Sequence, residues 1–302
     1  MMKRAVLVLI TSAGAWAQVG GPALGLVPDG AQVRAMYGMP GAGAVGAVIS
    51  GGSTLGNIAI SPAQNYAVAT ATNDGSTVLV LASGAVSPIA GAAANASRIV
   101  MSPQGSTAAL WLPANSHFEI LSGLPGAATV RDIDATAFGP PLAFAVSDGG
   151  QVAGSWADGV RMFGTDGSVT PVSIGGRVLE LAFFAQRTDL AAATLTQVIS
   201  VVNGAASVLD QFGTESRRQI PDAPAGIAVS ADNRWIVTAL HGGQVVTVNV
   251  ASGATARIDC GCTPEGVFAM GGSVFRLTSE SVKLIDASSG SVFAVPVAGG
   301  QQ

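Results

Sequence analysis

The chain has 302 residues and a formal net charge of −4, from 14 Lys and Arg against 18 Asp and Glu, and only 11% of its residues are charged. Typical soluble domains contain about 25% charged residues. This chain has an excess of Ala, Val and Gly in their place, which indicates close-packed strands. Nucleic-acid binding needs a basic patch, and after the N-terminal Lys3 and Arg4 no Lys or Arg cluster occurs beyond Arg217 and Arg218. We expect no nucleic-acid partner and no attraction to anionic membrane surfaces.

The N-terminus has the three parts of a secretory signal. Lys3 and Arg4 are basic, residues 5–10 are apolar, and Ala15-Trp16-Ala17 is a small-residue cleavage sequence. The pattern predicts a signal peptide over residues 1–17, cleaved after Ala17, and a periplasmic or extracellular protein. The apolar run is too short for a spanning helix, and later apolar stretches are punctuated by Gly, Pro, Asn and Ser, so we expect no membrane span.

One apolar pattern recurs six times after residue 50, each time before a polar turn and a second apolar stretch. The third residues of its copies are separated by 41, 45, 37, 46 and 40 positions, and the copies are Ile58-Ala-Ile60, Ile99-Val-Met101, Phe144-Ala-Val146, Leu181-Ala-Phe183, Ile227-Ala-Val229 and Val267-Phe-Ala269. A period near forty made of short strands is typical of the blades of a β-propeller. We therefore predict an all-β chain with six recognisable four-stranded blades.

The fifth repeat can be divided into its strands. The sequence predicts them at 226–230, 235–240, 244–250 and 255–259, each five to seven residues long and rich in β-branched types. We call them strands a to d, from the centre of the ring outwards. The turn Ala231-Asp-Asn-Arg234 between strands a and b has the residues that turns favour.

This repeat resembles the YVTN and WD40-like propeller repeats of secreted bacterial proteins. The residues that carry the resemblance are Ser230-Ala-Asp-Asn-Arg-Trp-Ile-Val-Thr-Ala239 and Val246-Thr-Val-Asn-Val-Ala-Ser-Gly253. The chain is also similar to secreted bacterial propellers that share a Cys-Gly-Cys-Thr-Pro ending, a family to which no activity is assigned. The chain departs from the YVTN and WD40-like repeats at two points. The Val-Thr-Asn of the YVTN repeat is Val237-Thr-Ala239 here, and no Trp-Asp dipeptide occurs.

Residues 23–50 add a hairpin before the first clear repeat. The turn Pro28-Asp-Gly30 separates two apolar stretches. This hairpin either builds a reduced seventh blade or adds to the sixth, because an open ring leaves unpaired edges. We expect one propeller domain over residues 18–302, with six or seven blades.

Propeller topology sorts the loops into two faces. The turns between strands b and c and the crossings from strand d to the next blade share one face, which we call the b–c face. Loops on a rigid scaffold commonly carry binding residues. We predict this face to bind a ligand or partner through His117, an exposed Trp156, Asp158, Arg217, His241 and Glu280.

Cys260-Gly-Cys262 contains the only two cysteines of the chain. An oxidising compartment favours a disulfide between them. Free thiols without a role, or a metal site with His241 and Glu265, are the alternatives. We predict the disulfide, and no metal or other cofactor.

Two classes of function fit these features. The first is a monomeric binding scaffold for a protein, peptide or glycan on the b–c face. The second is a hydrolase or lactonase that uses the central funnel, which would need clustered acids and bases or a metal. With two His and 18 acidic residues, many of them in turns, we favour the binding scaffold and assign no catalytic residue.

Overall fold

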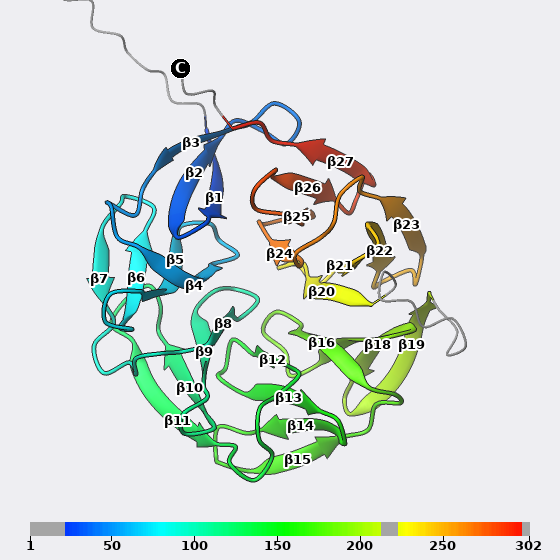
Figure 1. The fold of residues 1–302 in the computed structure, drawn as a ribbon. Coiled ribbons are helices and arrows are strands. Elements are labelled where there is room, and N and C mark those ends of the chain that lie inside the picture. The colour runs from blue at the N-terminus through cyan, green and yellow to red at the C-terminus, as the bar shows by residue number, and fades with distance from the viewer. Residues whose placement is uncertain (1–21, 213–222, 298–302) are drawn as a thin grey trace, which may run out of the picture.

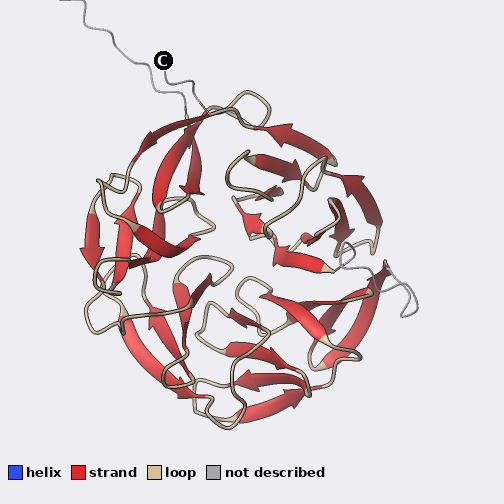
Figure 2. Ribbon diagram, in the orientation of Figure 1, coloured by secondary structure: helices blue, strands red, loops and turns tan. Residues whose placement is uncertain are grey.

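The computed structural model describes residues 22–212 and 223–297. The predicted signal peptide and Arg217 lie outside these ranges. The described residues form 27 β-strands and no helix (Figure 2). None of them therefore belongs to a helix that could cross a membrane.

The strands form seven antiparallel sheets arranged as blades around a central axis (Figure 1). Six sheets have four strands and the first has three. The predicted all-β propeller is confirmed, and the blade number left open at six or seven is seven. The N-terminal hairpin belongs to the first blade instead of extending the last one.

The blades follow one another in chain order. The strands of the first three are β1 (Ala23–Asp29), β2 (Gln32–Tyr37), β3 (Ala44–Val48); β4 (Leu55–Ile60), β5 (Tyr66–Ala71), β6 (Thr77–Leu81), β7 (Val86–Pro88); β8 (Arg98–Met101), β9 (Thr107–Leu112), β10 (His117–Ser122), β11 (Thr129–Asp134). Those of the fourth and fifth are β12 (Ala143–Val146), β13 (Val152–Trp156), β14 (Gly159–Phe163), β15 (Val169–Val172); β16 (Val178–Phe183), β17 (Leu190–Thr194), β18 (Gln197–Val202), β19 (Ala205–Gln211). Those of the last two are β20 (Pro224–Val229), β21 (Trp235–Leu240), β22 (Gln244–Asn249), β23 (Thr255–Asp259); β24 (Phe268–Ala269), β25 (Val274–Arg276), β26 (Lys283–Asp286), β27 (Ser291–Ala294).

The serine that ends strand a in four repeats organises the turn to strand b. Ser61, Ser102, Ser147 and Ser230 are all buried. In the sixth blade, the backbone N–H groups of Arg234 and Trp235 donate to Ser230 Oγ at 3.1 and 2.9 Å. The corresponding serines accept equivalent bonds from the residues after their turns. The repeated serine thus satisfies backbone donors that the tight turn would leave unpaired.

The hydrophobic core lies between the blades. Seven clusters of buried apolar side chains are present among the described residues, one for each pair of neighbouring blades. The cluster between the first and last blades, for example, joins Val27 and Met36 to Leu284. Both faces of the central sheets are covered in this way, which explains the scarcity of charge in the sequence.

The two ends of the described chain meet at the junction of the first and seventh blades. The backbone N–H of Val45 in β3 donates to the carbonyl of Pro296 at 2.9 Å. Val45 also forms a parallel bridge with Val297, where the chain continues from β27 (Figure 1). The C-terminal segment therefore supplies the outermost pairing of the three-stranded first blade.

The serine turn can be tested at Ser230. We expect Ser230→Ala to lower the free energy of unfolding by about 1–2 kcal/mol, because the Trp235 N–H loses its side-chain acceptor and the Arg234 N–H keeps only Asp232 Oδ1. Ser252→Ala is the matched control, since Ser252 is exposed and bonds only to its own turn. Urea unfolding would measure both variants. Equal effects at the two positions would contradict the role of the buried serine.

Candidate functional site

A cavity of about 360 Å³ lies in the centre of the ring. Small-molecule sites commonly have volumes of about 300–1,000 Å³. The innermost strands of the second to seventh blades form its wall, which is mostly apolar. Representative wall residues are Ile58, Val100, Phe144, Leu181, Ile227 and Val267.

Three charged residues line one end of this cavity. In the third blade, Arg98 pairs with Trp111, near the turn between β9 and β10. In the fifth blade, Glu180 follows Val178, which pairs with Thr194 at the end of β17. Glu265 precedes β24 and its backbone N–H donates to Leu277 O at 2.9 Å. Since these positions adjoin the b–c turns, Arg98, Glu180 and Glu265 lie toward the b–c face, and we call them the charged mouth.

The guanidinium of Arg98, from the third blade, contacts the inner edge of the fourth blade and approaches a side chain of the fifth. Its Nη1 donates to the carbonyl of Leu142 at 3.3 Å, and its Cζ lies 5.3 Å from the centre of the Phe144 ring. Its Nη2 is 3.7 Å from Glu180 Oε2. The protein therefore holds Arg98 by a carbonyl and an aromatic face, with Glu180 as a looser ionic partner.

The carboxyl group of Glu180 has few partners. Its side chain is 22% exposed, and the contact with Arg98 is too long for a hydrogen bond. No other described residue donates a hydrogen bond to it in the structure. Desolvation raises the pKa of Glu180 to about 7, although the positive charge of Arg98 acts in the opposite direction. Near neutral pH this group is thus divided between its protonated and ionised forms.

A second charged arrangement lies beside Glu265. The guanidinium of Arg276 is buried and its Nη1 donates to Thr278 O at 3.3 Å and Ser279 Oγ at 2.6 Å. Its Cζ is 4.1 Å from the Phe268 ring centre. Burial lowers the pKa of Arg276 to about 10, an effect that nearby Glu265 opposes, so Arg276 remains charged at neutral pH. Phe268 itself is 41% exposed and lines the cavity.

The opposite end of the ring is tied by side chains of the a–b turns. Both oxygens of the Asp148 carboxylate accept backbone N–H bonds, from Gln104 at 2.9 Å and Gln186 at 2.8 Å. Gln186 Nε2 donates to Gln104 Oε1 at 3.2 Å, and Gln64 Nε2 donates to Ala269 O at 3.1 Å. The Asp148 bonds join the fourth blade to both of its neighbours, and the two glutamine bonds connect blades that are not neighbours in the chain. Together they hold the innermost strands in position.

Four of the residues predicted from the sequence lie at separate b–c turns: His117, Asp158, His241 and Glu280. His117 lies 3.3 Å from Asp134 of its own blade, and Asp158 pairs with Arg161 at 2.7 Å. Within residues 22–212 and 223–297, no hydrogen bond or ion pair joins any two of His117, Asp158, His241 and Glu280. The structure therefore does not assemble them into one acid–base cluster. Their role on a binding face stays a prediction.

The expectation of an exposed Trp156 is wrong. Its side chain is buried, 5% exposed, between the third and fourth blades. The indole Nε1 donates to Gly139 O at 2.9 Å, and the ring packs against Phe118, Phe138 and Phe163. The b–c turn directs this side chain into the aromatic core instead of to solvent.

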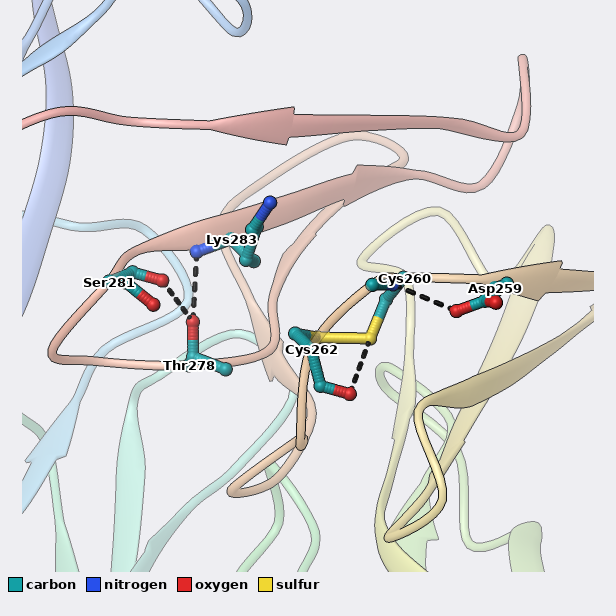
Figure 3. The surroundings of a disulfide bond; sticks show 7 residues. Asp259, Cys260, Cys262, Thr278, Ser281 and Lys283 are labelled. Carbon is teal, nitrogen blue, oxygen red and sulfur yellow. Dashed lines mark hydrogen bonds between the residues drawn. A yellow bond between two sulfur atoms is a disulfide. The ribbon is translucent and has the colours of Figure 1, made fainter.

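Cys260 and Cys262 are joined by a disulfide in the crossing from the sixth to the seventh blade (Figure 3). The Cys260 side chain is buried among apolar residues of both blades. The Cys260 N–H donates to Gly243 O at 2.9 Å, which connects the crossing to the turn after His241. The linkage thus fixes part of the b–c face.

Nothing in the described ranges supports the metal alternative. No group of three or more His, Cys, Asp or Glu that could hold a metal ion occurs among these residues. The two sulfur atoms are bonded to each other, and Glu265 lies in the charged mouth.

Arg98 and Glu180 were not among the residues predicted from the sequence, and Glu265 was named only as a ligand in the metal alternative. A signal for the first two exists, because they are charged positions in strands a, which are otherwise largely apolar. Sequence reasoning placed binding residues only on loops and so passed over the strands.

Comparison with solved structures shows the same fold in proteins of distant sequence. A streptogramin B lyase structure has a TM-score of 0.60 and 13% identity, covering 83% of this chain and 84% of that one. A catalytically inactive virginiamycin B lyase from Staphylococcus aureus, with quinupristin, has a TM-score of 0.58 and 11% identity over 82% and 86% of the two chains. No family model matches the chain, and no curated protein is similar to it. At these identities the likeness concerns the fold alone.

The burial of Glu180 predicts a pH-dependent stability. Its pKa of about 7 in the folded state is above the ordinary value of 4.5, so between these pH values the folded state binds more protons than the unfolded state. Stability then falls as pH rises from about 4.5 to 7. Glu180→Gln cannot ionise, and we expect the variant to gain up to about 3 kcal/mol relative to the wild type between pH 4.5 and 8. Urea unfolding across this range measures the difference.

The matched control for Glu180→Gln is Asp166→Asn, in an exposed c–d turn where hydrogen bonds from Ser168 lower the pKa of Asp166. Asp166 is ionised throughout this pH range, so its variant should keep the wild-type slope. Parallel curves for all three proteins would contradict the assignment to Glu180.

The contact between the disulfide crossing and the b–c turn can be tested at Gly243. A Cβ at this position would lie 2.6 Å from Cys262 O, whereas at Gly253 nothing lies within 4 Å. Both glycines have positive φ, 90° and 68°. We expect Gly243→Ala to cost about 2 kcal/mol more than Gly253→Ala in thermal or urea unfolding. Equal losses would show that only the backbone angle matters.

Proposed function

We propose that the protein is an exported, monomeric binding propeller that captures a peptide segment of a partner on its b–c face. The observation that carries this proposal is the apolar cavity that ends in the charged mouth. Such a cavity suits insertion of a side chain with an apolar stem and a polar end. The surrounding b–c turns and crossings would contact the rest of the peptide.

A peptide is favoured over a glycan by the aromatic residues. In the part of the chain that the structure describes, Trp111 and Trp156 are buried and Trp235 is half-buried. The b–c face therefore lacks a described tryptophan ring available for stacking a sugar. An apolar cavity with few polar groups is instead the type of site that holds an apolar anchor of a peptide.

Peptide display on the immobilised mature protein tests the proposal. We expect selected peptides to bind the wild type and to lose at least tenfold in affinity with the double variant Asn115→Arg/Ala157→Arg, in two exposed b–c turns. The matched control is Ser83→Arg/Ser252→Arg, in exposed turns of the opposite face. The control adds the same charge and should bind normally. Failure to select any peptide, or equal loss in both double variants, would overturn the proposal.

An enzyme acting in the cavity is the alternative function. Glu180 supports it, because a carboxyl group with a pKa near 7 can act as an acid or a base at neutral pH. The b–c turn residues that could assist it are not gathered around one point. Turnover of an added lactone or ester that Glu180→Gln abolishes would favour the enzyme over the binding scaffold.

A further inference from the structure

We propose that the central cavity receives the side chain of a lysine or arginine from the bound peptide, with Glu180 and Glu265 holding its positive charge. This inference rests on the proposed peptide-binding function and names the chemistry that the cavity selects. We favour a basic side chain because the arginines near the cavity donate hydrogen bonds to groups of the protein, whereas the two carboxylates accept none from the described residues.

The two arginines near the mouth have partners supplied by the protein. Arg276 is buried, with Thr278 and Ser279 accepting its hydrogen bonds. Arg98 donates to Leu142 and lies over Phe144. Both cations are thus already directed toward groups of the protein.

The two carboxylates are not committed in the same way. Glu180 has only the 3.7 Å contact with Arg98. Glu265 lies near the charge of Arg276 but is exposed and makes no hydrogen bond with it. Among the described residues, no side chain or backbone group donates a hydrogen bond to either carboxylate. A carboxylate next to an apolar wall gains most from a cationic donor, since the low local dielectric strengthens the pair.

One blade separates the two carboxylates around the cavity. Glu180 belongs to the fifth blade and Glu265 to the crossing into the seventh, so the sixth blade lies between them. There Gly226 lines the cavity without a side chain, and it lies close against the segment before β24, since a Cβ at that position would be 2.6 Å from Val267 N. A basic group above Gly226 could approach both carboxylates.

The wall below the mouth suits the rest of such a side chain. Lysine and arginine pack their methylene stems on apolar surface while the charged end stays in a polar region. Leu181 and Ile227 supply apolar surface, and the exposed ring of Phe268, which already carries Arg276 over one face, adds to it. The same wall would accept norleucine, so the carboxylates alone distinguish a lysine from its uncharged isostere.

Four capped pentapeptides, Ala-Ala-X-Ala-Ala with lysine, arginine, norleucine or glutamate at X, test the inference on the mature protein. Saturation-transfer NMR and titration give the dissociation constants. We expect the lysine and arginine peptides to bind about fivefold or more tightly than the norleucine peptide. Glu180→Gln and Glu265→Gln should each reduce this advantage by about threefold or more. Asp166→Asn, on the opposite face, should leave it unchanged.

Several outcomes overturn the inference. Equal binding of lysine and norleucine removes the role of the carboxylates, and stronger binding of the glutamate peptide assigns the mouth to Arg98. Binding of free n-butylammonium without binding of the lysine peptide restricts the cavity to small cations. If circular dichroism shows that Glu180→Gln is unfolded, the Glu265→Gln variant still tests the role of the carboxylates, because Glu265 is exposed.

The two proposals can fail separately. If displayed peptides bind the b–c face but show no preference for basic residues, the binding function stands and the basic anchor is wrong. If no peptide of any kind binds, the proposed function itself fails.

Discussion

The structure depends on packing between blades. Each of the seven buried apolar clusters joins two neighbouring blades, so a single blade could not bury its apolar faces alone. An open ring would expose two such faces and two strand edges. The pairing of Val45 with the segment at Pro296 and Val297 removes this cost, because it joins the first blade to the last. Ring closure therefore ties the stability of every junction to the two ends of the described chain.

This architecture also explains why so few charges are present and why their positions are informative. Strands b and c are covered on both sides, and short side chains such as Ala67, Ala109 and Ala192 let the sheets approach closely. A charge in such a ring is tolerated only where it meets a partner or the central cavity. Arg276 meets the first condition, with two acceptors and an aromatic ring. Glu180 meets the second, and it remains short of hydrogen-bond donors.

The sequence predicted the features that repeat and missed those that do not. The turns after strand a, such as Ser61-Pro62 and Ser230-Ala231, recur because the same buried hydroxyl accepts backbone hydrogen bonds in four blades. This local rule revealed the period. The number of blades depended on whether the hairpin after Ala23 could pair with a segment over 240 residues away, which no local pattern encodes. The burial of Trp156 was missed for the same reason. Its b–c turn was placed correctly, but the aromatic residues that pack against the ring come from different strands and blades. The charged mouth likewise gathers residues from three blades.

The cavity is held in a form that suits binding without a large rearrangement. At the far end, Asp148 joins the turns of the third and fifth blades, and Gln64 connects the second blade to the seventh. These bonds fix the positions of strands a, on which Arg98 and Glu180 are carried. A ligand that meets a preformed wall loses less free energy to ordering the protein than one that must assemble its site. Glu180 lacks a hydrogen-bond donor, and the rigid ring does not supply one because Arg98 donates to Leu142 instead. In the proposed complex, a donor from the ligand would be the missing partner of Glu180.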